Sequence, residues 1–166
     1  MFIIKLLGGA LVAVCGTLTG VYLGEKLKTR TLFLEQYIRF LTIAQTMIGY
    51  TASNIRTVLG DTKDLPLIKP ITENALLGLD SGKSFEEAWK EAVNKTVHNS
   101  EDKKMLFYFG AVFGTSDIDG ELAKLGMQKE SCRRRLDELK DELKTKKRLY
   151  RTLGAFCGVL VAVVLL

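Results

Sequence analysis

The sequence has little of what enzymes and metal proteins use for chemistry. Its 166 residues include one histidine, three cysteines and two prolines. His98 stands in a polar setting at the expected end of a helix, and no two cysteines have the spacing of a metal-binding or redox pair. Cys132 stands alone, whereas Cys15 and Cys157 lie in apolar segments. We therefore predict no enzyme activity, no metal site, no cofactor and no disulfide.

Charge is almost absent from both ends of the chain. Residues 2–23 contain one charged residue, Lys5, and residues 152–166 contain none. A helix of 22 residues is about 33 Å long, and one of 18 residues is about 27 Å long, against a bilayer core of about 30 Å. We therefore predict transmembrane helices at residues 2–24 and 149–166, joined by a domain at residues 25–148. A cleaved signal peptide, the rival interpretation of the first segment, would need a small-residue cleavage site that is missing here.

Basic residues flank the inner end of each predicted span. Lys26, Lys28 and Arg30 follow the first span. The second has its own basic flank: Lys144, Lys146, Lys147, Arg148 and Arg151. By the positive-inside rule, the central domain lies in the cytoplasm and both termini lie outside. We expect the second basic flank to contact anionic membrane lipid.

Glycines recur at every fourth residue in both predicted spans. Small residues at this spacing let helices approach closely in lipid, where apolar area gives no drive to associate. We therefore predict helix packing at these glycines, within the chain or against partner proteins: Gly16, Gly20, Gly24, Gly154 and Gly158.

The central domain has the apolar spacing of helices and almost no alternation of apolar and polar residues. The pattern predicts helices at about residues 31–59, 66–79, 84–97 and 101–113. Ser84 and Glu87 form a capping box at the start of the third of these. The first carries an apolar stripe: Leu34, Tyr37, Ile38, Leu41, Ala44 and Ile48. We expect an all-α fold, an antiparallel helical bundle flanked by the two transmembrane helices.

The last predicted helix runs without interruption from about residue 116 to 166. No proline and no loop-like composition separates its polar part from the C-terminal apolar segment. Its apolar residues recur at the alternating spacing of a heptad seam, which Lys129 and Lys146 interrupt. The seam consists of Ile118, Leu122, Leu125, Lys129, Cys132, Leu136, Leu139, Leu143, Lys146, Tyr150 and Leu153.

One short motif looks like a phosphate-binding loop. Gly78, Gly82, Lys83 and Ser84 follow one another in the right order, but three residues separate the glycines where four are needed. No buried strand precedes the motif to direct backbone N–H groups at a phosphate. A turn between two helices, followed by an N-cap at Ser84, accounts for all of these residues.

Nucleic-acid binding is not expected either. The run Arg133 to Arg135 is basic, but three consecutive residues spread over most of a helical turn. The nearby Glu130, Asp137 and Glu138 cancel the field of the three arginines. The run therefore reads as a solvated helix face.

A set of motifs lies in the second half of the chain, within a similarity that covers all of it: Gly82-Lys83-Ser84 with Ala88-Trp89, then Asp102, Leu106, Phe109, Gly110 and Gly114 to Asp117, and finally Tyr150 to Gly154 with Gly158. In this order and spacing they resemble the stage III sporulation protein AB family of endospore-forming bacteria. The soluble domain of that family is similar to the F inner-membrane platform protein of type II secretion. Glu121 stands where the family pattern leads us to expect glutamine. The acidic residue and the proline expected around residues 48–51 are also absent.

The resemblance implies a non-enzymatic platform subunit of the secretion-like channel that joins mother cell and forespore, required for endospore formation. It places the protein in the mother-cell membrane around the forespore. The partners it implies are a secretion-type ATPase and other membrane subunits of the channel, and a homo-oligomer is possible. Two alternatives stay open, a two-span membrane sensor and a membrane-tethered nucleotide-binding enzyme.

Polar interruptions between the apolar helices are the expected contacts of the ATPase. They form two short segments that separate the second predicted helix from the third and the fourth from the fifth. The candidate residues are Ser81, Gly82, Ser84, Gly114, Thr115, Ser116, Asp117 and Asp119.

Overall fold

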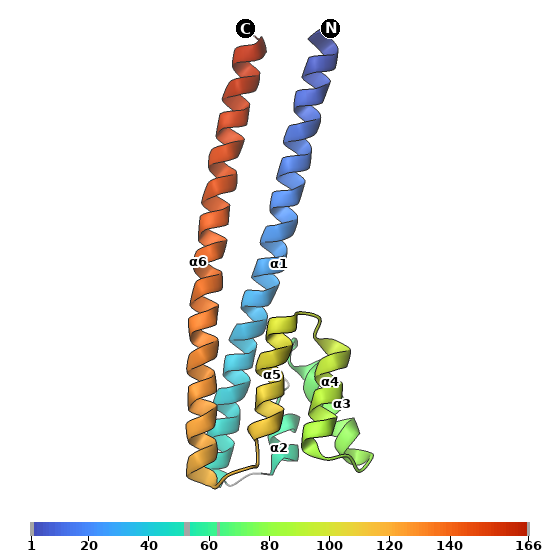
Figure 1. Cartoon of the computed structure of the whole chain (residues 1–166), viewed down its shortest axis with the longest axis vertical. Helices are drawn as coiled ribbons and strands as arrows, with labels where there is room; N and C mark the ends of the chain where they lie inside the picture. Colours follow the sequence, from blue (N-terminus) through green and yellow to red (C-terminus); the bar gives the residue numbers. More distant parts are fainter. Residues whose placement is uncertain (1, 52–53, 63, 166) are drawn as a thin grey trace. The chain divides into compact units, whose positions relative to one another are not determined.

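The computed structural model of the chain is built from helices (Figure 1). In order they are α1 (Phe2–Thr51), α2 (Ile55–Gly60), α3 (Lys69–Asp80), α4 (Phe85–Thr96), α5 (Ser100–Val112) and α6 (Ile118–Leu165). The structure describes the backbone of all residues except 1, 52–53, 63 and 166, and the side chains of residues 24–50, 54–62, 64–146, 148, 149 and 152. No strand occurs in the described backbone, so the all-α prediction is confirmed.

The chain divides into two compact units. Unit 1 comprises residues 1–32 and 135–166, and unit 2 comprises residues 33–134. Helices α1 and α6 therefore contribute residues to both units, whereas α2 to α5 belong to unit 2 alone.

The predicted start and end of the first central helix are wrong. We expected a helix at about residues 31–59, but α1 begins at Phe2 and ends at Thr51, and α2 is a separate helix. Residues 25–30 contain no glycine or proline that would stop a helix. The new start at α2 comes from Asn54, whose side chain accepts a hydrogen bond from the backbone N–H of Arg56 at 3.2 Å.

Helices α3, α4 and α5 lie close to their predicted positions because their ends carry clear signals. Pro70 stands in the first turn of α3, and the predicted capping box of Ser84 and Glu87 opens α4. Asn99 caps α5 by accepting hydrogen bonds from two backbone N–H groups.

The predicted continuity of the last helix is confirmed, since α6 runs as one helix from Ile118 to Leu165. Of the predicted seam, Leu125, Cys132, Leu136 and Leu139 are buried. Ile118 is an exception, with 49% of its surface exposed at the start of the helix.

The core of unit 2 is centred on Trp89 of α4. Its ring lies 4.9 Å from that of Phe109 and 5.9 Å from that of Phe40, measured between centroids. Two glycines bring neighbouring helices close together. A Cβ at Gly110 would lie 2.5 Å from Cδ1 of Trp89, and one at Gly78 would lie 2.6 Å from the Cβ of Ala88.

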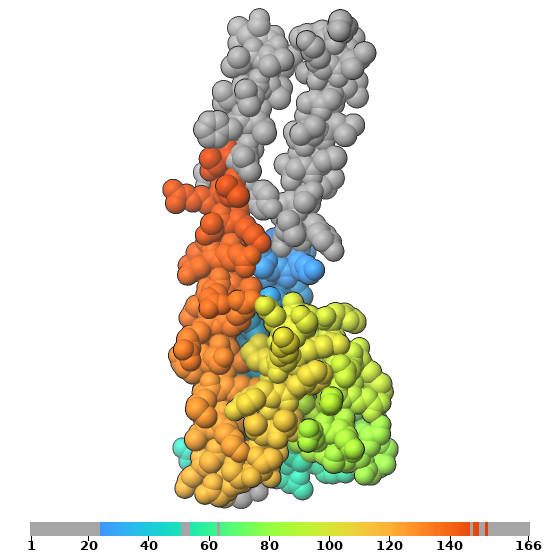
Figure 2. Space-filling view, viewed as in Figure 1, coloured from blue at the N-terminus to red at the C-terminus, as the bar shows by residue number. Residues whose placement is uncertain are grey.

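Helix α1 is buried on a wider face than its predicted stripe. Leu34, Tyr37, Leu41, Ala44 and Ile48 are buried as predicted, whereas Ile38 is only partly buried. Phe40, which the stripe left out, is fully buried. Its ring lies 5.9 Å from that of Trp89 in α4 and 5.4 Å from that of Phe109 in α5, the helix whose atoms form part of the face seen in Figure 2.

Ion pairs lie along the part of α6 that belongs to unit 1. Glu142 lies 2.6 Å from Lys146, and Arg135 lies 2.7 Å from Glu138. The hydrogen bond from Lys146 lowers the pKa of Glu142, and the positive charges of Lys146, Arg135 and Arg30 act in the same direction.

Among the side chains that the structure describes, no helix has a stretch long and apolar enough to cross a membrane. The predicted spans at residues 2–24 and 149–166 lie outside this part of the chain, except for residues 24, 149 and 152. Of the five glycines expected to pack in the membrane, only Gly24 is described, and a Cβ there would meet nothing within 4 Å. Gly16, Gly20, Gly154 and Gly158 lie outside the described side chains.

Candidate functional site

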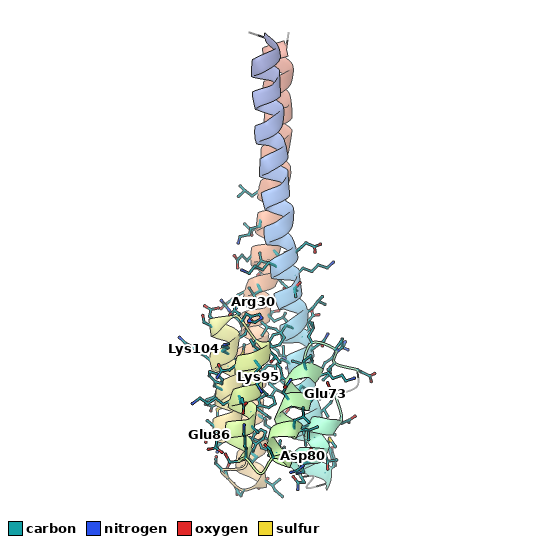
Figure 3. The ribbon with its side chains drawn as sticks, turned by 90° about the vertical axis from the view of Figure 1, so that its right-hand side faces the viewer. Arg30, Glu73, Asp80, Glu86, Lys95 and Lys104 are labelled. Atoms are coloured by element: carbon teal, nitrogen blue, oxygen red, sulfur yellow. The ribbon has the colours of Figure 1, made fainter. Side chains whose placement is uncertain are left out.

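The two segments predicted to contact a partner are the α3–α4 turn, residues 81–84, and the α5–α6 turn, residues 113–117. Both lie at the same end of unit 2 (Figure 1). Asp80 and Glu86 flank the first turn at this end, whereas Lys95 and Lys104 lie nearer the opposite end (Figure 3). Residues from two parts of the sequence thus lie at one end of unit 2, which we call the turn surface.

The α3–α4 turn is held by backbone hydrogen bonds. The N–H of Gly82 donates to the carbonyl oxygen of Leu79 at 3.1 Å, and that of Lys83 donates to Gly78 at 3.2 Å. Gly82 has a φ of 85°, a left-handed conformation that glycine adopts without strain. The hydroxyl of Ser84 then accepts the N–H of Glu87 at 3.3 Å and opens α4.

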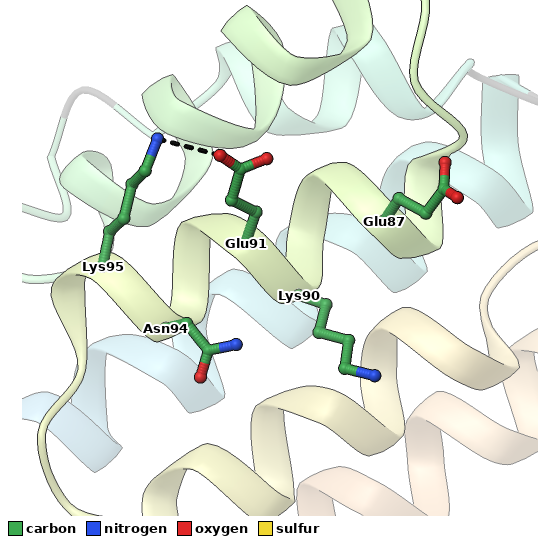
Figure 4. A pocket seen from close by; sticks show the side chains of 5 residues that line it. All are labelled: Glu87, Lys90, Glu91, Asn94 and Lys95. Atoms are coloured by element: carbon green, nitrogen blue, oxygen red, sulfur yellow. Dashed lines mark ion pairs between the residues drawn. The ribbon is translucent and has the colours of Figure 1, made fainter.

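Lys83 is turned along α4 rather than toward the turn. Its ammonium group pairs with Glu91, which also lies 3.1 Å from Lys95 (Figure 4). Two hydrogen bonds lower the pKa of the Glu91 carboxyl, the larger effect coming from Lys83 and the smaller from Lys95. The segment is therefore the predicted turn between helices, and its lysine is used in an ion pair on the helix surface.

The α5–α6 turn is organised by one carboxylate that the sequence analysis noted only as a departure from the family pattern. Glu121 is 6% exposed, and its Oε1 accepts hydrogen bonds from the N–H of Thr115 and of Ser116, both at 3.1 Å. The hydroxyl of Ser116 donates to the same oxygen at 2.8 Å. Lys124 donates to the hydroxyl of Thr115 at 2.8 Å.

The start of α6 has its own cap. Asp117 accepts the N–H of Gly120 at 3.1 Å through its side chain, and Gly114 has a φ of 77°. Glu121 stands four positions after Asp117, one more than the spacing of a capping box, so that pattern does not identify it in the sequence.

Most of the predicted contact residues therefore shape the turns themselves. The side chains of Ser81, Ser84, Thr115, Ser116 and Asp117 all form hydrogen bonds with the helix end beside their own turn. Gly82 and Gly114 supply the backbone conformation. Asp119 differs, because it is exposed and its side chain has no partner in the described part of the chain. Glu86, at the start of α4, is exposed in the same way.

A second group of polar residues is buried inside unit 2, away from the turns. The amide nitrogen of Gln128 donates to the hydroxyl of Tyr37 and to the carbonyl oxygen of Met105, both at 2.8 Å. The amide oxygen of Gln128 is buried and has no partner among the described residues. Burial raises the pKa of Tyr37, with a smaller contribution from Cys132.

Cys132 lies in the same buried region. Its Sγ is 3.0 Å from the sulfur of Met105. Burial, helped by the negative charge of Asp102, raises the pKa of the thiol to about 12. In the described part of the chain, no three His, Cys, Asp or Glu side chains gather where they could hold a metal ion.

The described fold defines a class of protein, an all-α chain in which four short helices stand in sequence between two long ones, with a capped polar turn before α4 and another before α6. The family model of stage III sporulation protein AB matches residues 5–166, and the chain belongs to this family. Membership implies a role in sporulation and confirms the resemblance seen in the sequence. No curated protein and no solved structure is similar enough to the chain to count as a match.

Proposed function

We propose that the protein is a non-enzymatic platform subunit of the channel between mother cell and forespore, and that its turn surface docks a secretion-type ATPase. Family membership supports a role in sporulation. The turn surface supports docking, because it brings two polar turns together on the ends of well-packed helices. Each turn is held by hydrogen bonds within the chain, so little conformational freedom is lost on binding.

The observation that carries the proposal is the charge at this surface. Glu86 and Asp119 are exposed carboxylates without a partner in the described part of the chain. Such groups are available to lysine and arginine side chains of another protein. We therefore expect the ATPase to present a basic surface, and we expect the association to weaken as salt increases.

The proposal places the central residues in the cytoplasm and the two apolar ends in the membrane. It rests on the apolar length of residues 2–24 and 149–166 and on the lysines and arginines that flank them. A cysteine introduced at the exposed His98, in a chain with Cys15 and Cys157 replaced by alanine, tests this orientation. A membrane-impermeant maleimide should label it only after the inner membrane is permeabilised, and labelling in intact cells would contradict the proposal.

Docking is tested with the full chain in lipid nanodiscs and the purified secretion-type ATPase of the same organism. We expect saturable binding by calorimetry, and we expect Glu86→Lys with Asp119→Lys to weaken it at least about tenfold, since several charge contacts change sign. Glu130→Lys is the matched control, because Glu130 is an exposed carboxylate of α6 beyond the turn surface. Absence of binding, or an equal effect of the control, would refute docking at the turn surface.

A further inference from the structure

A groove of about 580 Å³ on the side of unit 2 is bordered by charged side chains that form no ion pair with any other described residue. Arg39 of α1 and Arg133 of α6 lie on it, together with Asp61 and Asp64 of the connection between α2 and α3. All four are exposed, and none has an ion pair or hydrogen bond of its side chain in the described part of the chain. We call this feature the charged groove.

Some other charged residues of unit 2 are paired, since Arg56 pairs with Asp80 and Lys83 pairs with Glu91. In the charged groove two positive and two negative groups surround one hollow, and none of them pairs with another of the residues that the structure describes. The guanidinium groups come from α1 and α6, whereas the carboxylates come from the α2–α3 connection, so the two signs lie on different elements.

The groove is apolar between these charges and is already formed. Ile38, Ile43 and Leu65 line it beside Thr42. The α2–α3 connection is fixed against its neighbours, because the hydroxyls of Thr62 and Thr72 lie 2.8 Å apart and are buried. The N–H of Leu67 also donates to the side chain of Gln36 on α1 at 2.7 Å.

From this arrangement we propose that the charged groove is the contact between two copies of the chain. A twofold axis brings the same surface of both copies together, so a surface must be complementary to itself. Two arginines and two aspartates on different elements meet this requirement. Arg39 and Arg133 of one copy face Asp61 and Asp64 of the other, and the apolar parts of the two grooves cover each other.

A second copy fits the charge better than a different partner. A surface with an excess of one charge binds best to a surface of the opposite charge, and the acidic turn surface is of this kind. The charged groove has equal numbers of both signs, and its own rotated image supplies the complement of each. Exposed ion pairs add little affinity but suppress wrong partners, so the contact is selective and weak, and confinement to a membrane raises its occupancy.

The first test is disulfide cross-linking of the full chain in lipid vesicles, without any ATPase. Cys15 and Cys157 are replaced by alanine, and Thr42→Cys places a thiol in the groove. Asn94→Cys, exposed on α4, is the matched control. We expect oxidation to give several times more covalent dimer from Thr42→Cys than from Asn94→Cys. Equal dimer from the two variants would overturn the proposal, and so would cross-linking only to other membrane proteins.

The second test reverses the charges in the Thr42→Cys chain. A chain with Arg39→Asp and Arg133→Asp should lose its dimer at least about fivefold, and so should a chain with Asp61→Arg and Asp64→Arg. Mixed in one vesicle, the two chains should form the covalent heterodimer at the level of the parent, because each supplies what the other lacks. Dimers from either reversed chain at the parental level, or no heterodimer from the mixture of folded chains, would refute the contact.

Discussion

The indole nitrogen of Trp89 in α4 donates a hydrogen bond of 2.7 Å to the carbonyl oxygen of Leu106 in α5. The two helices can come this close because Gly110, one turn further along α5, leaves room for the indole ring. A Cβ at Gly110 would lie 2.5 Å from Cδ1 of Trp89. Two features therefore hold Trp89, the only tryptophan of the chain. One is this hydrogen bond, and the other is the close packing that the missing side chain of Gly110 allows.

Gly110→Ala should therefore destabilise unit 2. The added methyl group must displace a large buried ring, and overpacking of this kind lowers the free energy of unfolding by about 1–3 kcal/mol. Gly60→Ala is the control, because a Cβ there meets nothing within 4 Å. Urea unfolding of the full chain in detergent, followed by the fluorescence of Trp89, measures both. If Gly60→Ala lowered the free energy of unfolding as much as Gly110→Ala, the close contact between Gly110 and Trp89 would not explain the loss of stability.

The buried pair of Tyr37 and Gln128 should behave as a unit. Tyr37→Phe or Gln128→Leu alone removes one partner and should lower the free energy of unfolding by about 1–3 kcal/mol. In the double variant neither the Tyr37 hydroxyl nor the Gln128 amide is left behind without the other, so the double variant should lose less than the sum of the two, by at least about 0.5 kcal/mol. Urea unfolding of the four chains of this cycle measures the difference. Strict additivity would mean that the hydrogen bond contributes nothing.

Glu121 should determine the shape of the α5–α6 turn. Glu121→Ala removes the acceptor of two backbone N–H groups and should destabilise the turn by about 1–3 kcal/mol. Glu121→Gln keeps an acceptor oxygen at the same place and should cost less than half as much. Amide hydrogen exchange at Thr115 and Ser116 reports the change directly. Exchange as slow in Glu121→Ala as in the parent would contradict this role.

Cys132 should be almost inert in the folded protein. A thiol pKa of about 12, against a reference value of 9.0, lowers the thiolate fraction at pH 8 about a thousandfold. In the chain with Cys15→Ala and Cys157→Ala, a thiol reagent should therefore react with Cys132 only as fast as the protein unfolds. Rapid reaction without unfolding would show that the thiol is accessible.

The same pKa predicts how stability depends on pH. The unfolded thiol ionises near pH 9 and the folded one only near pH 12, so above pH 9 the unfolded state has lost a proton that the folded state keeps. The free energy of unfolding should therefore fall as pH rises above about 9. In Cys132→Ala this part of the decline should be absent, and an identical decline in both chains would contradict the assignment.

The sequence predicted helix boundaries well where the residues at the helix ends form caps or turns. The capping box of Ser84 and Glu87, and Gly82 and Gly114 in the turns, gave α4 and the two turns within a few residues. The break before α2 was missed because its only signal is the short side chain of Asn54. Gln128 and Glu121 were missed because hydrophobic periodicity counts apolar residues, and these two are polar residues in buried positions. The charged groove combines three segments that are distant in sequence, so no local pattern could predict it.

The hydrogen bonds between α1 and α6 also have a consequence for synthesis of the chain. Gln45 donates to the carbonyl oxygen of Leu122 across 77 residues of sequence, and Gln128 donates to Tyr37 across 91. Contacts among α3, α4 and α5 are local by comparison and can form as soon as these helices leave the ribosome. Until residues beyond 128 have emerged, the face of α1 that α6 covers lacks its partner. During this interval the uncovered face of α1 is accessible to a chaperone or to an assembly factor.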